Sequence, residues 1–184
     1  ELIVTLTIWA LPVLFAITLH EAAHGYAARH FGDPTAELAG RISLNPLRHI
    51  DPMGTVVVPG LIVAVSTLLG GSPMLFGWAK PVPVDFRRLH NPKADMLWVA
   101  AAGPFANLVM ALGWAMLFRF AIMSPDNVYA LPMAKMADAG MQINAVLMLL
   151  NLLPLPPLDG GRIAVSLLPA GPAYTFSRLE PDRK

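Results

Sequence analysis

Four long apolar stretches without a charged residue alternate with polar connectors, at residues 2–19, 53–70, 96–118 and 141–153. About 20 consecutive apolar residues are enough for a helix to cross the hydrocarbon core of a bilayer. The first stretch is continuous with residues 20–31, which we interpret as the second part of one long helix. The pattern therefore predicts three core helices, at residues 2–31, 96–118 and 141–153.

The stretch at residues 53–70 is interrupted by Pro59-Gly60, so we expect either a kinked spanning helix or a re-entrant one. The first helix is expected to end at Gly32-Asp33-Pro34, because glycine and the residue before proline both disfavour helical continuation. Residues 119–139 have the mixed composition of a surface segment. Residues 169–184 form a part-amphipathic tail that we expect at the membrane interface.

Two connectors favour extended chain. Residues 40–45 alternate polar and apolar side chains, and a turn signal follows at Asn45-Pro46. Residues 77–85 contain Pro81 and Pro83, which forbid a helix and remove backbone donors from one strand edge. We therefore expect a short strand or an extended piece at each place.

The composition is that of a membrane protein rather than of a soluble domain. Hydrophobic residues make up 55% of the chain and charged residues 14%, whereas soluble domains are about 25% charged. The net charge of +1 gives no reason to expect nucleic-acid binding, and the absence of cysteine excludes disulfides, thiolate zinc sites and a cysteine nucleophile. We expect one integral-membrane domain over residues 1–184, whose first apolar stretch is a retained spanning helix.

The candidate chemistry begins with His20-Glu21-Ala22-Ala23-His24, at the end of the first apolar stretch. On a helix, residues four apart share one face, so both imidazoles can bind one metal ion, with Glu21 beside them as a general base. A polar face of a soluble helix would be the ordinary alternative. Ionisable groups inside a membrane segment are costly and indicate function, which favours a zinc site.

A third ligand is needed, and Asp159 is the best candidate. It follows the proline-rich run Pro154-Leu155-Pro156-Pro157, which ends the preceding helix, and it precedes Gly160-Gly161, which lets the backbone approach a neighbour closely. A deeply placed carboxylate requires a partner such as the metal. The alternative is an N-cap for a helix at residues 163–168. Asp51, Asp85 and Asp95 lie in hydrophilic connectors and are weaker candidates.

Asn107 is the strongly polar residue of the apolar stretch 96–118, next to a small-residue face at residues 100–106. It either forms a structural hydrogen bond between helices or takes part in the site. The residues alone leave both alternatives open.

Three separated motifs resemble the site-2 protease family of intramembrane zinc metalloproteases. They are the His20–His24 motif in a first apolar helix, Gly103-Pro104 with Asn107 in a middle helix, and a late run from Asn151 through Asp159 to Gly161. Together they anchor residues 2–168. The connectors resemble the compact branch of the family, which has no PDZ domain.

The resemblance implies an all-α polytopic membrane protein: a core of three transmembrane helices, a small membrane-embedded β element at residues 40–45 and 77–85, and a re-entrant or additional helix at residues 53–70. It implies one catalytic Zn²⁺ held by His20, His24 and Asp159. It also implies that Asn107 and Asn151 bind substrate backbone or the oxyanion. In the family, the metal-motif helix and the Gly-Pro helix run in opposite directions. A single crossing by residues 53–70 would make them parallel, so this segment is either re-entrant or followed by an extended piece that crosses back inside the protein. Basic residues lie in the connectors on both sides of the segment, which favours re-entry.

The expected function is hydrolysis of a peptide bond within or near a transmembrane segment of a membrane-protein substrate, in regulated intramembrane proteolysis. The alternative is a metal or proton transporter that uses the same His/His/Asp site. A non-catalytic scaffold would need a fourth protein ligand such as His49 or His90, and neither has a convincing spacing. We expect a multi-pass protein of a prokaryotic inner membrane, embedded in the lipid bilayer, with its active site nearer the cytoplasmic face. The sequence gives no indication of the oligomeric state.

Overall fold

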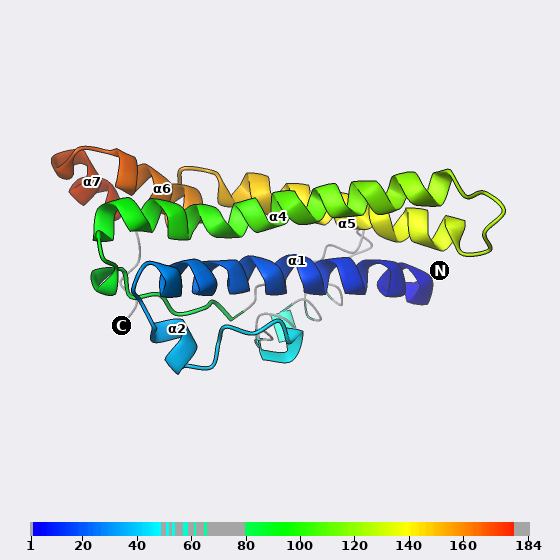
Figure 1. Cartoon of the computed structure of the whole chain (residues 1–184), viewed down its shortest axis with the longest axis horizontal. Helices are drawn as coiled ribbons and strands as arrows, with labels where there is room; N and C mark the ends of the chain where they lie inside the picture. The colour runs from blue at the N-terminus through cyan, green and yellow to red at the C-terminus, as the bar shows by residue number, and fades with distance from the viewer. Residues whose placement is uncertain are drawn as a thin grey trace.

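The computed structural model describes residues 2–48 and 80–178 together with the isolated positions 51, 53, 57, 58, 61 and 65, and for residues 2–6 it describes the backbone alone. Three long helices carry the architecture: α1 (Leu2–His30), α4 (Pro92–Ile122) and α5 (Ala130–Asn151). α4 and α5 form an antiparallel hairpin, and α1 packs against both (Figure 1). Figure 1 also shows α1 and α4 running in opposite directions, as the resemblance implied.

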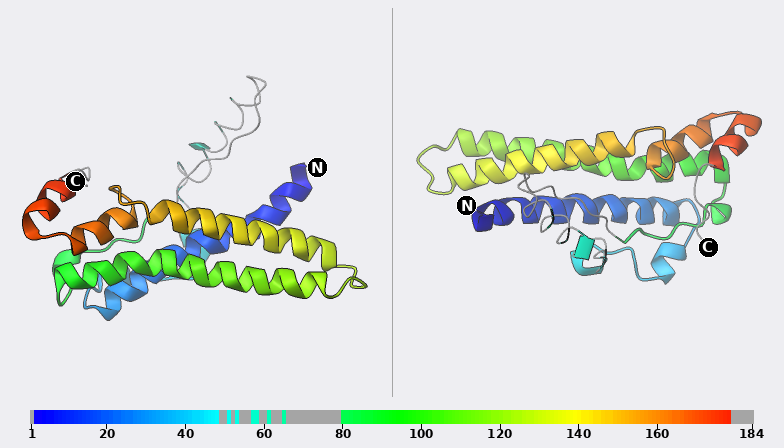
Figure 2. Two further views of the ribbon diagram at one scale, coloured as in Figure 1. Left: turned by 90° about the horizontal axis from the view of Figure 1, so that it is seen from above. Right: turned by 180° about the vertical axis from the view of Figure 1, so that it is seen from behind.

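Five short elements complete the described part of the chain: α2 (Thr35–Leu38), η1 (Pro46–Arg48), η3 (Phe86–Arg88), α6 (Asp159–Leu167) and α7 (Ala170–Ser177). α6 packs against α4, and α7 packs against α6. In the two views of Figure 2, α6 and α7 lie beyond the end of α5, beside the first turns of α4. The C-terminal helices are thereby brought next to the C-terminal half of α1.

The expected end of the first helix is present, and its glycine has a physical role. α1 ends at His30, and Gly32 adopts φ +104°, a left-handed conformation that glycine enters without a Cβ penalty. The Asp33 N–H then donates to the Ala28 carbonyl, which satisfies one of the last carbonyls of the helix. This turn directs the chain towards α2.

The predicted helix boundaries were too narrow around the α4–α5 connector. Residues 119–139, expected to be a surface segment, are mostly helical, because α4 continues to Ile122 and α5 already begins at Ala130. The added part of α5 is rich in Ala, Met, Leu and Lys, which are strong helix formers even where the apolar pattern is weak. The connector therefore shrinks to residues 123–129.

The expected β element does not appear among the described residues, where no strand is assigned. Residues 40–45 and 80–85 are irregular, and residues 77–79 lie outside the description. The reason is visible in residues 80–85, which we call the strap: its Val82 and Asp85 N–H groups donate to the carboxylates of Glu21 and Asp33 rather than to a neighbouring strand. Pro81 and Pro83 have no N–H to offer.

Among the described residues, α4 is the one helix that is both long and apolar enough to cross a membrane. Only 11% of the residues in its most apolar window are buried. The prediction of a spanning or re-entrant helix at residues 53–70 falls almost entirely outside the described residues and stays a prediction.

A small apolar cluster fixes the end of the bundle where the strap passes. Ala28 of α1, Leu89 after η3 and Val99 of α4 are buried together, and Val84 and Phe86 pack against them. This cluster holds the strap and the first turns of α4 against the last turns of α1, which is where the predicted metal motif lies.

Candidate metal centre

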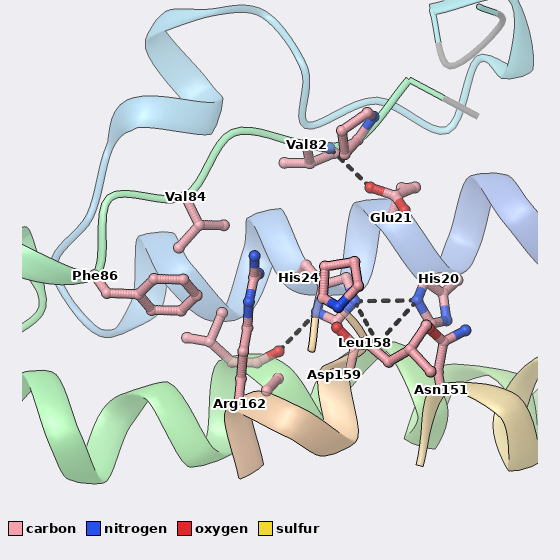
Figure 3. Close-up of a pocket in the computed structure, with 14 residues that line it drawn as sticks. His20, Glu21, His24, Val82, Val84, Phe86, Asn151, Leu158, Asp159 and Arg162 are labelled. Atoms are coloured by element: carbon pink, nitrogen blue, oxygen red, sulfur yellow. Dashed lines mark hydrogen bonds and ion pairs between the residues drawn. The ribbon is translucent and has the colours of Figure 1, made fainter. Parts of the chain in front are cut away.

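His20, His24 and Asp159 meet in one place. The two histidines lie one turn apart on α1, and their Nε2 atoms are 3.1 Å from each other. Asp159, the first residue of α6, places its Oδ2 atom 3.3 Å from each Nε2 (Figure 3). All three side chains are buried. The structure therefore brings Asp159 of α6 against the two histidines of α1, although Asp159 is distant from them in the sequence.

The Asp159 side chain reaches the histidines because the chain folds back sharply before it. A Cβ atom at Gly160 would lie 2.3 Å from the Leu153 carbonyl oxygen, and one at Gly161 would lie 2.7 Å from the Pro156 nitrogen. Only glycine lets the first turn of α6 pack so closely on the end of α5. The N-cap of α6 is Leu158, and no side chain caps this helix. The alternative role of Asp159 as an N-cap is therefore not what the structure shows.

The second nitrogen of each imidazole is held by an oxygen atom. The Nδ1 of His24 lies 2.7 Å from the Val99 carbonyl oxygen, and the Nδ1 of His20 lies 2.6 Å from Oδ1 of Asn107. A carbonyl oxygen only accepts hydrogen bonds, so each Nδ1 carries the proton of a neutral ring. Both Nε2 atoms then direct a lone pair towards Asp159.

This arrangement fits a divalent cation. Three lone-pair atoms face one another at 3.1–3.3 Å, and Oδ2 of Asp159 is buried without a hydrogen-bond donor in the described part of the chain. Zinc–ligand bonds of about 2.0–2.1 Å in a tetrahedron separate neighbouring ligand atoms by about 3.3 Å. The His/His/carboxylate set is one that zinc prefers, and the described residues offer no fourth His, Cys, Asp or Glu ligand at this cluster.

Glu21 lies beside the ligands and is held by the strap. Its Oε2 atom accepts a hydrogen bond of 2.8 Å from the Val82 N–H. The strap is fixed a second time at Asp85, whose N–H donates to Oδ2 of the fully buried Asp33 at 2.7 Å. The predicted base is therefore not a free surface carboxylate, because a backbone donor orients it.

A cavity of about 130 Å³ opens beside the three ligands, which is room for several water molecules. Figure 3 shows that its walls come from α1, the strap, α4, the end of α5 and α6. It is lined by His20, Glu21, His24, Pro81, Val82, Val84, Phe86, Val99, Ala100, Asn151, Pro157, Leu158, Asp159 and Arg162.

The two asparagines named from the sequence are separated by the structure. Asn151 lines the cavity, as a substrate-contacting residue would. Asn107 does not line it; it is fully buried behind His20 and also donates to Asn144 on α5. The interhelical hydrogen bond that the sequence left open for Asn107 is therefore present. Asp51, Asp85 and Asp95 do not join the metal ligands.

Three groups at the metal centre and its cavity were not predicted from the sequence. Arg162 lines the cavity and places its guanidinium carbon 5.0 Å from the centre of the Phe86 ring. Its position three residues after Asp159 on one helix was a usable signal. The other two contributors are the Val82 N–H and the Val99 carbonyl. These are backbone groups, so the residue type at each position does not predict the contact.

Several relatives share long stretches with this chain. A Bacillus subtilis (strain 168) protein named "Putative zinc metalloprotease YwhC" is 38% identical over 178 residues, which cover 92% of this chain and 73% of that protein. "Putative zinc metalloprotease Rip2" of Mycolicibacterium smegmatis is 34% identical over 148 residues, covering 80% of this chain and 52% of that protein. Rip2 of Mycobacterium tuberculosis (strain ATCC 35801) is 31% identical over 150 residues with the same coverage. The chain thus spans about half the length of the Rip2 proteins.

No protein-family profile and no solved structure matches the chain. Two imidazoles and a carboxylate form a ligand set that zinc prefers, and the relatives are named "Putative zinc metalloprotease". The chain belongs to the site-2 protease family of zinc metalloproteases, and its cofactor is zinc.

Proposed function

We propose that this metalloprotease hydrolyses a peptide bond within or near a transmembrane segment of a membrane-protein substrate. The observation that carries the proposal is the position of Glu21, in one cavity with the three zinc ligands. A three-ligand protein site with an adjacent carboxylate base is the arrangement of hydrolytic zinc enzymes.

The side chains have distinct parts in the reaction. Zinc at such a site supplies a Lewis acid that acidifies water and polarises a carbonyl group. Glu21 takes a proton from the attacking water as its oxygen bonds to the scissile carbonyl carbon, and returns a proton to the amide nitrogen as the C–N bond breaks. The products are a carboxylate and an amine. The Val82 N–H engages one oxygen of Glu21, which leaves the other to accept the proton.

The exposed surface of α4 supports a location in the lipid bilayer. Large apolar residues at positions 105, 109, 112, 116 and 120 are exposed and recur every three or four residues, which places them on one stripe. Phe105 is 64% exposed and Met116 is 69% exposed. A contiguous apolar stripe of this length is unfavourable in water and favourable in lipid. Because the long helices α1 and α5 pack alongside α4, we propose that they share the bilayer with it, as in a multi-pass protein.

The basic residues around the metal centre support a cytoplasmic orientation. Arg29 lies in the last turn of α1, Arg87 and Arg88 form part of η3, and Lys93 lies in the first turn of α4. The last turn of α1 and the first turn of α4 lie at the same end of the bundle (Figure 1), and lysine and arginine concentrate in cytoplasmic connectors. We place the active site nearer the cytoplasmic face of a prokaryotic inner membrane, where it acts in regulated intramembrane proteolysis.

The strap and Asn151 are the proposed substrate contacts. A helical substrate hides its carbonyl groups in hydrogen bonds, so it must unwind locally before hydrolysis. The strap borders the cavity, and its Val82 and Asp85 N–H groups are already bound to carboxylates. We therefore propose that its backbone carbonyl groups accept hydrogen bonds from the N–H groups of an unwound substrate segment. Asn151 lines the opposite wall, where its amide can bind substrate backbone.

The test compares zinc content and cleavage of a transmembrane substrate in detergent for the wild type, Glu21→Gln and the control Glu37→Gln. Glu37 is an exposed residue of α2 paired with Arg29. We expect one zinc ion in all three proteins and loss of cleavage in Glu21→Gln alone, by a factor of at least about 100. A wild type that binds zinc, cuts nothing and moves metal ions across vesicle membranes would instead establish the transporter. Undiminished cleavage by Glu21→Gln would remove Glu21 as the base.

A further inference from the structure

A chain of hydrogen bonds links the zinc ligand His20 to two buried asparagines on other helices. Oδ1 of Asn107 on α4 lies 2.6 Å from Nδ1 of His20 on α1. Nδ2 of Asn107 donates to Oδ1 of Asn144 on α5 at 2.9 Å, and Nδ2 of Asn144 donates to the Gly140 carbonyl at 2.9 Å. Both asparagines are completely buried. We call this series of contacts the asparagine relay.

The direction of every hydrogen bond in the relay is fixed by backbone carbonyls. The Gly140 carbonyl can only accept, so Asn144 must turn its amide nitrogen towards it and its oxygen towards Asn107. The Ala16 carbonyl, 3.2 Å from Nδ2 of Asn107, imposes the same orientation on the second asparagine. Asn107 therefore presents its oxygen to His20.

The consequence is a defined proton position on the ligand. Because Oδ1 of Asn107 accepts, Nδ1 of His20 carries the proton and Nε2 keeps the lone pair that faces Asp159. The other histidine obtains the same result from a backbone group, the Val99 carbonyl. His20 alone depends on side chains, which substitution can remove.

We propose that Asn107 and Asn144 are positioning residues that tune the zinc affinity of the site by fixing the tautomer and ring orientation of His20. Asn144 touches no ligand, and it acts through Asn107. The inference rests on the zinc site of the proposed function and extends it to α5, a helix that contributes no ligand. Groups that hydrogen-bond metal-ligating histidines typically change metal affinity by a factor of about 10 to 100 when removed.

The experiment measures the zinc dissociation constant of the purified full chain in detergent, by competition with a chelator, for Asn107→Leu, Asn144→Leu, Asn107→Asp and the control Gln142→Leu. Gln142 is exposed on the same helix as Asn144 and bonds only to Asp138 in the described contacts. Asn107→Leu should weaken binding by a factor of about 10 to 100. Asn144→Leu should weaken it less, since the Ala16 carbonyl still orients Asn107. Asn107→Asp keeps an acceptor for His20 but turns its second oxygen towards the acceptor oxygens of Ala16 and Asn144, so it should bind zinc more tightly than Asn107→Leu and less tightly than the wild type. Gln142→Leu should match the wild type.

A spectroscopic readout separates positioning from mere packing. In metal-free protein with ¹⁵N-labelled histidine, at a pH where the imidazoles are neutral, His20 should be protonated at Nδ1 in the wild type and should lose this preference in Asn107→Leu. This wild-type measurement holds even if a leucine variant fails to fold, and protonation at Nε2 would overturn the proposal. Leucine variants that lower only the thermal unfolding midpoint, with zinc affinity and tautomer unchanged, would overturn it as well. A wild type without zinc affinity would instead contradict the proposed function itself.

Discussion

Gly103 of α4 lies directly against the ring of His24: a Cβ atom at position 103 would be 2.4 Å from the Nε2 atom of His24. The same Cβ would be 2.6 Å from Cε1 of His20. Both distances are far shorter than any van der Waals contact, so α4 can pass behind the two ligands only because residue 103 has no side chain. The role of Gly103 is thus to leave space for the two imidazole rings of the metal centre.

We therefore predict that Gly103→Ala displaces the imidazoles and weakens zinc binding by a factor of at least about 10. The matched control is Gly113→Ala on the same helix, where a Cβ would meet no atom within 4 Å. Alanine also has the higher helix propensity, so the control should be as stable as the wild type or more so. Chelator competition measures the zinc affinity of both variants, and equal affinities would show that the rings accommodate the methyl group.

The hydrogen bond between the strap and Glu21 can be removed without changing Glu21. Val82→Pro eliminates the N–H that donates to Oε2, whereas Val82→Ala keeps this donor and shortens only the side chain. A hydrogen bond to a charged group contributes about 1.5–3 kcal/mol, so we expect kcat to fall by a factor of about 10 or more in Val82→Pro. Zinc content should be unchanged in both variants. A Val82→Pro enzyme as fast as Val82→Ala would show that the base needs no such orientation.

Asp33 is predicted to anchor the far end of the strap. Its side chain is completely buried and accepts hydrogen bonds from the Thr35 N–H and hydroxyl and from the Asp85 N–H. Asp33→Asn places an amide N–H against one of these donors, which should cost about 1–3 kcal/mol of stability. The thermal unfolding midpoint in detergent should fall, whereas the exposed Asp126→Asn should leave it unchanged. Equal midpoints would refute the anchoring role.

Asn151 should respond to replacement by leucine differently from Asn107, for which we expect weaker zinc binding. Asn151→Leu removes an amide from the cavity wall, so we expect unchanged zinc affinity and a kcat/KM lower by a factor of about 10. Asn127→Leu, in the connector between α4 and α5, serves as a control far from the cavity. Loss of zinc from Asn151→Leu would reveal a structural role for this residue instead.

The ligands could be predicted from the sequence because each leaves a local signal. The histidine spacing marks one helical face, and Asp159 stands out between a proline run and two glycines. The structure brings these residues together. The fold was predicted as helical, and every long element among the described residues is a helix. The N-terminal end of α5 was predicted too late in the chain, because the prediction gave more weight to the apolar pattern than to helix propensity.

Other features depend on how distant segments pack, which a single sequence does not show. Residues 77–85 were expected to be extended because Pro81 and Pro83 forbid a helix, and the resemblance implied a β element there. Strand formation depends on a pairing partner, however, and the Val82 and Asp85 N–H groups donate to two carboxylates instead. Asn144 is a polar residue in an apolar stretch, like Asn107, and could have been noticed. That these two side chains meet, and in which orientation, depends on how α4 and α5 pack, which only the three-dimensional structure shows.

The order of the ligands along the chain sets when the metal site can first form. His20 and His24 leave the ribosome early, whereas Asp159 follows only after α4 and α5 have been synthesised. A nascent chain that still lacks α6 has two of the three ligands and no closed metal site. Synthesis therefore passes through stages that lack a complete metal site, and the three ligands come together only when α6 has docked.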